Sequence, residues 1–271
     1  KTYYEMRVRT YLPRRIPAII RLDGKAFHTF TRGFKRPFDD VIINCMQKTM
    51  KYLCQNIQGC VFGYTQSDEI TLVLCDYQKL DTDAWFGYNV QKMTSVAASM
   101  ATLAFNKALM IELQWLTSPL SQKKNRRTGY DKYEFEKYLE TIEKAIERGA
   151  LFDARAFSVP ENEVNNCLIW RQQDATKNSV QMLAQSLYSH KELQGINTKK
   201  LQDKMFTEKG VNWNDLPITY KRGSCCIKSE SDGWIIDESI PIFTQDRDYV
   251  SSRIAEYVKK HDANGFKSVY G

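Results

Sequence analysis

Histidine is scarce in this sequence, and its cysteines lack the spacing of a metal site. The three histidines, His28, His190 and His261, lie far apart, and none of the seven cysteines belongs to a Cys-x-x-Cys pair. A zinc site is therefore not expected. Most of the cysteines lie inside apolar stretches, where cysteine behaves as a small hydrophobic residue. We expect reduced, buried thiols in a cytoplasmic protein, because disulfide frameworks belong to oxidising compartments.

Long hydrophobic runs, internal repeats and low-complexity segments are also missing. No apolar run approaches the roughly 20 residues that span a bilayer, and no signal-peptide pattern opens the sequence, so we expect no membrane association. The first residue is Lys1 rather than Met, and we expect a short N-terminal stretch to precede it. Apolar residues make up 42% of the chain and charged residues 26%, as in ordinary globular proteins.

Acidic residues are fewer than basic ones, 32 against 39, which leaves a net charge of +7. This surplus suits a polyanionic partner, but many basic proteins bind no nucleic acid. One stretch, residues 118–130, concentrates positive charge and indicates an exposed basic loop. Its basic side chains are Lys123, Lys124, Arg126 and Arg127. The loop either contacts RNA phosphates or serves only solubility, and the sequence favours neither reading.

The spacing of apolar residues predicts strands and helices that alternate along the chain. Strands are predicted over residues 16–22, 59–65, 70–75, 152–159, 224–229 and 234–242. Helices are predicted over residues 40–57, 88–114, 131–148, 170–189 and 198–209. This order predicts an α+β fold, an antiparallel sheet with helices on one face. The basic loop and the later helices are then elaborations of that sheet.

Two acidic clusters lie where metal ligands would be useful. Asp23 follows the first predicted strand and precedes Gly24, and Asp68 and Glu69 lie in the turn between the second and third strands. If these strands are neighbours, both clusters project from the same edge of the sheet. Converging carboxylates there would hold two magnesium ions roughly 4 Å apart, the arrangement used for in-line phosphoryl transfer. Each cluster alone is also an ordinary turn sequence, since Asp-Gly and Ser-Asp pairs are common in turns.

The stretch after the first strand is basic and aromatic, which suits a triphosphate. Four backbone N–H groups are expected to point at the phosphates, those of Lys25, Ala26, Phe27 and His28. Additional positive charge comes from Arg32, Lys35 and Arg36. Phenylalanines of this stretch would stack on a base, although we expect at least half of them to lie in the core. We expect His28 to position or pack rather than to act as a general base.

Several stretches in this order resemble the tRNA-His guanylyltransferase family, and in particular its bacterial and archaeal guanylyltransferase-like branch of 3′-to-5′ polymerases. The matching stretches are Arg21–His28, Phe34–Asp39, Gly63–Glu69, Lys92–Ser99, Phe152–Arg155 and Trp170–Asp174. They keep their order over most of the chain, from about residue 16 to residue 188. The combination of Arg-Leu-Asp-Gly with Gln-Ser-Asp-Glu is the most specific part of the match.

The resemblance implies a polymerase-palm-like sheet in residues 1–150. Residues 151–271 would complete this core with additional helices and a C-terminal strand pair, as one compact unit. It also implies addition of nucleotides to the 5′ end of tRNA by a homotetramer. A 5′-monophosphate is first activated by ATP, and the 3′-hydroxyl of an incoming nucleoside triphosphate, GTP or another, then attacks the activated phosphate.

The matching positions imply roles for individual residues. Asp23 and Asp68 would be catalytic and hold two Mg²⁺ ions, and Gly24 would offer its carbonyl oxygen. Glu69 would support the catalytic site or contact a metal ion. The residues implied in nucleotide binding are Arg21, Lys25, Ala26, Phe27, His28, Arg36, Asp39, Ser67 and Lys92.

The sequence departs from the eukaryotic members just after its Trp-Arg-Gln-Gln-Asp stretch. Those enzymes carry His-Ile-Asn-Asn, which is associated with the selection of tRNA-His, whereas residues 176–179 read Thr-Lys-Asn-Ser here. Lys177 and Asn178 are candidate RNA contacts. The departure favours template-dependent repair of truncated tRNA 5′ ends over strict specificity for tRNA-His.

Three other functions stay open at this point. A tRNA-His-specific guanylyltransferase would use the same site. A palm-fold nucleotidyl cyclase also places carboxylates on a first strand and a hairpin, but the Gly-Gly-Asp/Glu-Glu-Phe turn of diguanylate cyclases is missing. A non-catalytic RNA-binding module would not need both acidic clusters.

Overall fold

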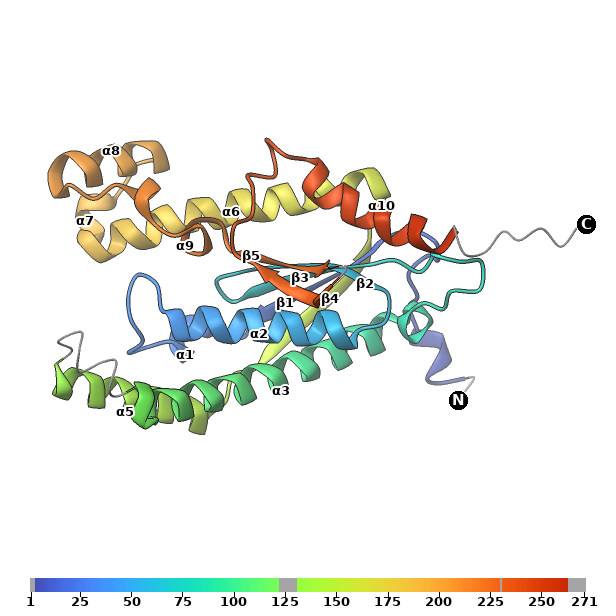
Figure 1. Cartoon of the computed structure of the whole chain (residues 1–271), viewed down its shortest axis with the longest axis horizontal. Helices are drawn as coiled ribbons and strands as arrows, with labels where there is room; N and C mark the ends of the chain where they lie inside the picture. The colour runs from blue at the N-terminus through green and yellow to red at the C-terminus, as the bar shows by residue number, and fades with distance from the viewer. Residues whose placement is uncertain (1–2, 122–130, 230, 263–271) are drawn as a thin grey trace, which may run out of the picture.

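A computed structural model describes residues 3–121, 131–229 and 231–262 of the chain (Figure 1). Its centre is a six-stranded antiparallel sheet in the order β4-β1-β3-β2-β5-β6. The strands are β1 (Ala18–Gly24), β2 (Cys60–Gln66), β3 (Glu69–Leu74), β4 (Phe152–Ser158), β5 (Ser224–Ser229) and β6 (Gly233–Asp237). The predicted α+β class with an antiparallel sheet is confirmed.

Helices cover both faces of this sheet (Figure 1). On one face lie α2 (Asp40–Asn56) and α3 (Val90–Thr117), with α5 (Lys132–Arg148) packed beside α3. On the other lie α6 (Glu161–Leu187) and α10 (Asp248–Asp262). The additional helices expected from the sequence therefore form a second layer. Because both faces are covered, the start of β1 reads as a continuous apolar run rather than an alternating one.

A small helical lobe extends the C-terminal half of α6, at the left end of Figure 1. It consists of α7 (His190–Leu193), α8 (Thr198–Lys209), η3 (Trp213–Asp215) and α9 (Ile218–Arg222). Its own apolar cluster includes Leu183, Met205 and Trp213. The remaining short elements are η1 (Met6–Val8), α1 (Phe27–Phe30) and η2 (Trp85–Tyr88).

Several predicted boundaries are corrected. Asp23 and Gly24 are the last two residues of β1 instead of following it, and β6 ends at Asp237 instead of residue 242. Helix α6 begins at Glu161, nine residues before the predicted start at residue 170. A proline at its N-cap and acidic residues in its first turn are start signals that the sequence reading missed. Helix α10 was not predicted at all.

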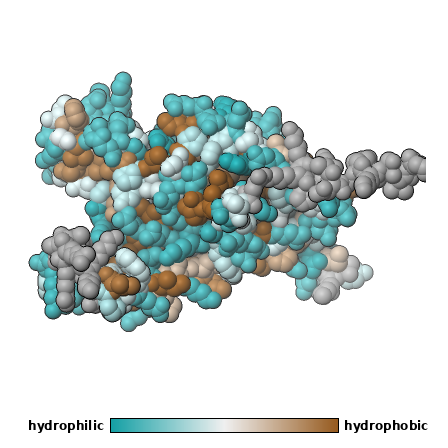
Figure 2. Space-filling model, viewed as in Figure 1, coloured by the Kyte–Doolittle hydropathy of each residue, from teal (hydrophilic) through white to brown (hydrophobic). Residues whose placement is uncertain are grey.

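Helix α3 corrects the expectation that no apolar segment is long enough to span a membrane. By length and composition it passes that test, with 33% of its most apolar window buried in the structure. Core helices of soluble proteins pass the same test, and one side of α3 packs in the core through Met93, Ala97 and Phe105. On its other side, Leu103 and Trp115 are exposed. Figure 2 shows separate hydrophobic patches on a largely hydrophilic face.

The cysteines are free thiols, and all of them except Cys167 are buried. Burial raises the pKa of both Cys45 and Cys75, which keeps these thiols protonated. The prediction of buried, unpaired thiols is confirmed for all of them except the partly exposed Cys167.

Candidate active site

The end of β1 and the tip of the β2–β3 hairpin lie side by side. Asp23 is opposite Glu69 in the β1–β3 pair, and the Gly24 N–H donates to the Asp68 carbonyl oxygen at 3.0 Å. Only Ser67 and Asp68 lie between β2 and β3, and Ser67 adopts a left-handed conformation with φ of 50°. This tight turn brings the two acidic clusters together beside the end of β1, as the sequence predicts.

Gly24 has no room for a side chain. A Cβ at this position would lie 2.2 Å from Phe27 Cδ2, so any larger residue would have to displace the buried Phe27 ring. Phe27 is buried and packs against Phe30, Phe105 and Phe152, which makes it a core residue. Gly24 is itself buried, packed against the Phe27 ring at the end of β1.

Asp23 and Asp68 have no cationic partner among the residues that the structure describes. Burial raises the pKa of Asp68, the Ser67 hydroxyl opposes this by donating to Oδ1 at 3.0 Å, and the Asp23 charge adds to the rise. Two neighbouring carboxylates that have no ion-pair partner favour a bound cation. Within the described residues no three His, Cys, Asp or Glu side chains converge, so these two are the ligand set on offer. Mg²⁺ fits, because it commonly binds through one or two carboxylates and keeps waters and substrate phosphates.

Glu69 is engaged by an arginine of α6. Arg171 Nε lies 2.6 Å from Glu69 Oε1, and Arg171 Nη2 donates to Glu69 Oε2 at 2.8 Å. The same guanidinium contacts Asp174 at 3.0 Å and lies over the Trp170 ring. The side chains of Arg171 and Glu69 are 8% and 14% exposed, so this ion pair is largely buried. Of the two roles considered for Glu69, the structure favours support of the hairpin, since both of its oxygens already face the guanidinium.

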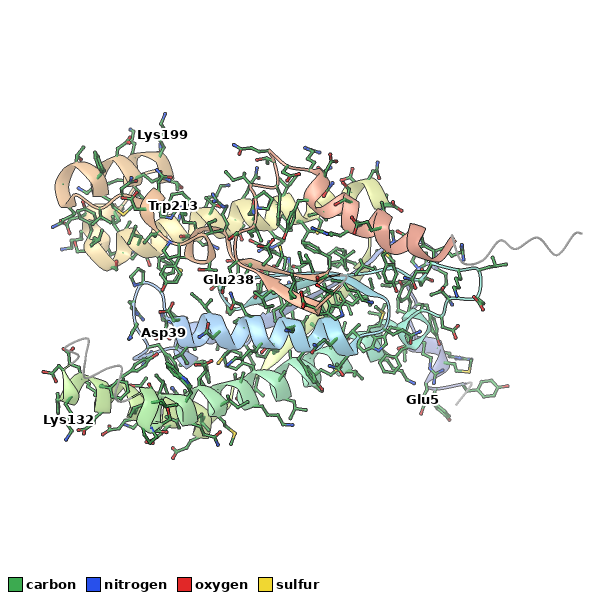
Figure 3. All side chains as sticks on the ribbon, in the orientation of Figure 1. Glu5, Asp39, Lys132, Lys199, Trp213 and Glu238 are labelled. Atoms are coloured by element: carbon green, nitrogen blue, oxygen red, sulfur yellow. The ribbon has the colours of Figure 1, made fainter. Side chains whose placement is uncertain are left out.

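A cavity of about 420 Å³ opens beside the hairpin tip. Its walls come from residues 27–39, the start of α2, the C-terminal half of α6 and α9. In Figure 3, Asp39 marks the α2 side of this region and Trp213 the helical lobe. The basic side chains that line it are His28, Lys35, Arg36, Lys221 and Arg222, and Ser67 and Asp68 form its acidic border. A concave, basic site of this size suits a nucleotide.

Two stacked aromatic rings line the same cavity. Phe38 and Tyr220 have ring centroids 4.6 Å apart and an interplanar angle of 24°. The Tyr220 hydroxyl donates to Asp40, and burial together with this bond raises the pKa of Tyr220 to about 12. The phenol therefore stays neutral at physiological pH. An aromatic surface beside basic side chains is suited to stacking on a nucleobase.

The segment that carries Tyr220 is hydrogen-bonded to β2 of the hairpin. The Tyr64 hydroxyl on β2 donates to the Arg222 carbonyl oxygen at 2.6 Å. Gly223 follows with φ of 80°, and a Cβ there would lie 2.1 Å from the Thr65 carbonyl oxygen. Only glycine permits this close approach. The cavity wall and the acidic hairpin are thus held in fixed relation.

The residues predicted to bind nucleotide are only partly gathered. Five of them line the cavity: Phe27, His28, Arg36, Asp39 and Ser67. Asp39 is already engaged, because it caps α2 by accepting from the Val41 N–H and also accepts from the Tyr138 hydroxyl. One donor of the predicted backbone cradle needs correction, since the Lys25 N–H donates to the Leu151 carbonyl oxygen at 2.8 Å. Arg21, Lys25 and Ala26 do not line the cavity.

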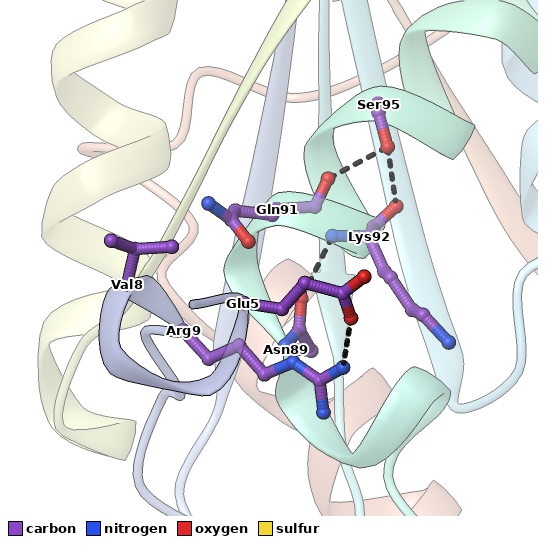
Figure 4. Close-up of a pocket in the computed structure, with 7 residues that line it drawn as sticks. All are labelled: Glu5, Val8, Arg9, Asn89, Gln91, Lys92 and Ser95. Carbon is purple, nitrogen blue, oxygen red and sulfur yellow. Dashed lines mark hydrogen bonds and ion pairs between the residues drawn. The ribbon is translucent and has the colours of Figure 1, made fainter. Parts of the chain in front are cut away.

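Lys92 lies far from this site within the chain. Figure 4 shows it at the start of α3, in a small pocket with Glu5 and Arg9. Helix α3 reaches the site only near Thr102, whose Oγ1 accepts from the Phe152 N–H beside the end of β1. Ten residues of helix, about 15 Å along the axis, separate the two points. The structure does not bring Lys92 to the carboxylates.

Most of the predicted RNA contacts lie outside the residues that the structure describes. Lys123, Lys124, Arg126 and Arg127 lie outside the described residues. Lys177 is exposed on α6, and Asn178 lines the cavity. The stretch that departs from His-Ile-Asn-Asn therefore borders the candidate nucleotide site.

The sequence reading gave no role to four residues that build this site: Arg171, Tyr220, Lys221 and Arg222. Arg171 belongs to a stretch that matches the family, so a signal for it existed. The other three follow the helical lobe, far along the chain from the acidic clusters. No local pattern connects them with Asp68.

Known proteins resemble this chain in both sequence and fold. A family model described as "Thg1: tRNAHis guanylyltransferase" matches residues 1–160. A bacterial tRNA(His) guanylyltransferase (Thg1)-like protein in complex with ATP is 42% identical, with a TM-score of 0.78 over 93% of this chain and 96% of that one. A structure of such a protein with GTP is 38% identical, with a TM-score of 0.73 and the same coverage.

A curated relative gives the same assignment. The probable tRNA(His) guanylyltransferase of Drosophila melanogaster is 25% identical over 224 residues, which cover 78% of this chain and 66% of the relative. The chain thus spans about two thirds of that relative's length. The family model covers more than half of the chain. The two bacterial structures match 93% of the chain and belong to the same family by description. This chain belongs to the tRNA-His guanylyltransferase family of nucleotidyltransferases.

Proposed function

We propose that the protein adds nucleotides to the 5′ end of truncated tRNA, growing the chain in the 3′-to-5′ direction and copying the opposite strand. The observation that carries this is the pair Asp23 and Asp68, without cationic partners, at the border of a basic cavity with an aromatic wall. The bacterial neighbours bound to ATP and to GTP support the nucleotide part of the proposal.

The proposed reaction has two steps. An oxygen of the RNA 5′-monophosphate attacks the α-phosphorus of ATP, which joins AMP to the RNA end and releases pyrophosphate. The 3′-hydroxyl of an incoming nucleoside triphosphate then attacks the RNA 5′-phosphorus, gives up its proton and displaces AMP. The new end keeps its triphosphate.

The cavity would hold the nucleotide in both steps. Phe38 and Tyr220 would stack on the base, and Lys35 and Arg36 would meet the phosphates, directing them toward Asp68. Arg171 would keep Glu69, and with it the hairpin tip, in place during the reaction. Two magnesium ions, held by Asp23, Asp68 and the Gly24 carbonyl oxygen, would supply charge neutralisation at the reacting phosphates.

Selection of the added base would come from pairing. The stretch Thr176–Ser179 lacks the His-Ile-Asn-Asn of the tRNA-His-specific enzymes. A site that ignores tRNA identity needs another source of selectivity, and the opposite strand of the acceptor stem offers one. A 5′-triphosphorylated RNA should react without ATP, because pyrophosphate is already a good leaving group.

The test uses two different tRNAs that lack their first nucleotide, each offered all four nucleoside triphosphates separately with Mg²⁺ and ATP. Addition of the complementary nucleotide to both tRNAs is the expected result. Addition restricted to tRNA-His, or addition of G whatever base stands opposite, would contradict the template-dependent reading. Turnover of nucleotide to a cyclic product without RNA would favour the cyclase.

Assembly and location belong to the same proposal. The family resemblance supports a homotetramer, and the buried free thiols support a cytoplasmic location. Light scattering of the purified protein would measure the assembly, and an octamer, dimer or monomer would contradict it.

A further inference from the structure

A second charged surface lies at the free edge of the sheet formed by β4. In the β1–β4 pair Asp23 is opposite Asp153, and Arg21 is opposite Arg155. Opposed residues of an antiparallel pair share a face, and so do residues two apart on one strand. One face of the sheet therefore carries a row of acidic side chains followed by a row of arginines.

The neighbours of these residues identify the face. Ala154 packs in the core beneath α2 and α3, whereas Phe157 packs in the core beneath α6. Because side chains alternate along a strand, Asp153 and Arg155 share the side of Phe157. Both are exposed, so α6 does not cover this corner of the sheet.

Arg21 lies on the same side, closer to α6. Burial raises the pKa of Glu69 and of Cys167 on α6, and the positive charge of Arg21 opposes the rise at both groups. Arg21 is partly buried. Its positive charge is therefore close enough to act on both the hairpin and α6, and its strand partner is the exposed Arg155.

The two arginines are like charges that face each other, and neither has an ion pair of its own among the described residues. Like charges directly opposite each other on a sheet are destabilising. Among the described residues, neither Arg21 nor Arg155 makes an ion pair or a hydrogen bond through its guanidinium. A sheet edge that places two unpaired guanidiniums opposite each other is suited to an anion.

We propose that Arg21 and Arg155 form a phosphate site beside the catalytic carboxylates, occupied by a phosphate group of the substrate. Phosphate oxygens accept from two guanidinium forks at once, which converts repulsion between the arginines into attraction. The arginine row lies two residues from Asp23, about 7 Å along the strand. A phosphate held here is therefore adjacent to the reacting group.

This inference rests on the proposed function, and the phosphate has two sources. It belongs either to the 5′ end of the RNA or to the triphosphate of a nucleotide. The exposed position of Arg155 at the sheet edge, away from the cavity, leaves room for a macromolecule. The ligand chemistry is the same in both cases, so binding measurements have to separate them.

The experiment compares Arg155→Gln, Arg155→Lys and a control, Lys107→Gln. Lys107 is an exposed cation on α3, which covers the opposite face of the sheet. Each variant is titrated with an acceptor-stem RNA hairpin lacking its first nucleotide, carrying either a 5′-monophosphate or a 5′-hydroxyl, and separately with ATP. Fluorescence anisotropy reports RNA affinity, and calorimetry reports ATP affinity.

For Arg155→Gln we expect roughly a tenfold or greater loss of affinity for one phosphate-bearing ligand, the size of a lost charge-assisted hydrogen bond. Loss confined to 5′-phosphorylated RNA identifies the RNA end, and loss confined to ATP identifies the triphosphate. Arg155→Lys should lose less, because it keeps the charge without the fork. If neither affinity falls further than with Lys107→Gln, the phosphate site does not exist.

Thermal unfolding provides a readout independent of activity. Without phosphate ligands, Arg155→Gln should unfold at the same or a higher temperature than wild type, because it removes a like charge. A clearly lower unfolding temperature would give Arg155 a structural role and overturn the proposal. A wild-type protein that binds phosphate through Arg155 but adds no nucleotide would refute the proposed function and leave this site standing.

Discussion

The two charged surfaces that meet at Asp23 and Asp68 are built differently. The cavity is concave and joins basic side chains to the stacked pair Phe38 and Tyr220, whereas the β4 edge is open and carries charged side chains alone. A concave aromatic surface can hold a base with its phosphates, and an open charged surface holds phosphate without regard to the base. This contrast favours a division in which the nucleotide lies on one side and the RNA end on the other.

The largest effect is expected where the two surfaces meet. Asp68→Asn should lower nucleotide addition by at least roughly a hundredfold, since it removes a charge on which both steps depend. ATP affinity in the presence of a chelator should change little, because the cavity walls remain. Near-normal addition by this variant with Mg²⁺ would refute the role of Asp68 in holding metal.

The same variant has an opposite effect on stability. Asp68 is partly buried beside Asp23, and both the burial and the neighbouring charge disfavour its ionised form. With metal removed by a chelator at neutral pH, Asp68→Asn should therefore unfold at a higher temperature than wild type. In Mg²⁺ the difference should shrink, because the cation stabilises only the wild-type pair.

A smaller effect is expected from the buried ion pair between Arg171 and Glu69. Arg171→Met leaves Glu69 buried without its partner, which costs about 3–5 kcal/mol of unfolding free energy. The displaced hairpin should also raise the Mg²⁺ concentration needed for half-maximal addition. Denaturant unfolding and a magnesium titration of the rate measure the two effects.

The double variant Arg171→Met with Glu69→Leu separates stability from positioning. It removes both charges, so much of the lost stability should return. The magnesium requirement should stay high, because the hairpin tip is still not anchored. If both the stability and the normal magnesium requirement returned, the ion pair between Arg171 and Glu69 would serve stability alone.

Next in size is the aromatic wall. Tyr220→Ala should weaken binding of ATP and GTP alike by about fivefold to a hundredfold, the range for loss of one base–aromatic stack. Tyr220→Phe keeps the ring and loses only the bond to Asp40, so its effect should be much smaller. Equal losses for the two variants would assign the role to the hydroxyl and remove the basis for calling this wall a base-binding surface.

The smallest effect concerns the basic loop of residues 118–130. Replacing Lys123, Lys124, Arg126 and Arg127 with Ser should weaken tRNA binding and lower its salt dependence by about 0.7–0.9 per lost phosphate contact. Addition to a minimal acceptor hairpin should be less affected than addition to whole tRNA. An unchanged salt slope would assign the loop to solubility.

Local sequence was enough to predict the acidic edge. The apolar run before Asp23 and the polar turn at Ser67 and Asp68 are short-range signals, and antiparallel pairing brings them together by itself. The fold class followed from the same periodicities. Boundaries were less certain, as the start of α6 shows, because a helix that buries one side under a sheet need not be strongly periodic at its first turns.

The other half of the site depends on contacts across long stretches of chain. Arg171 meets Glu69 across 102 residues, and the Tyr220 hydroxyl meets Asp40 across 180. No spacing rule connects such partners, since tertiary packing alone decides which helix reaches the hairpin. The engagement of Asp39 by Tyr138 was hidden for the same reason, although Asp39 does line the cavity where motif matching had placed it.

The pairing of β2 with β5 limits how this protein can be divided. Residues 1–160, the part matched by the family model, contain both Asp23 and Asp68, but the outer partner of β2 comes from Ser224–Ser229. A fragment ending at residue 160 would lack β5. The backbone of Gly63–Thr65 on β2, which is buried in the whole chain, would then form an unpaired edge of the sheet. Such edges recruit other chains and promote aggregation. Strand β5 thus covers the backbone edge of β2, and we expect a fragment trimmed to residues 1–160 to be insoluble.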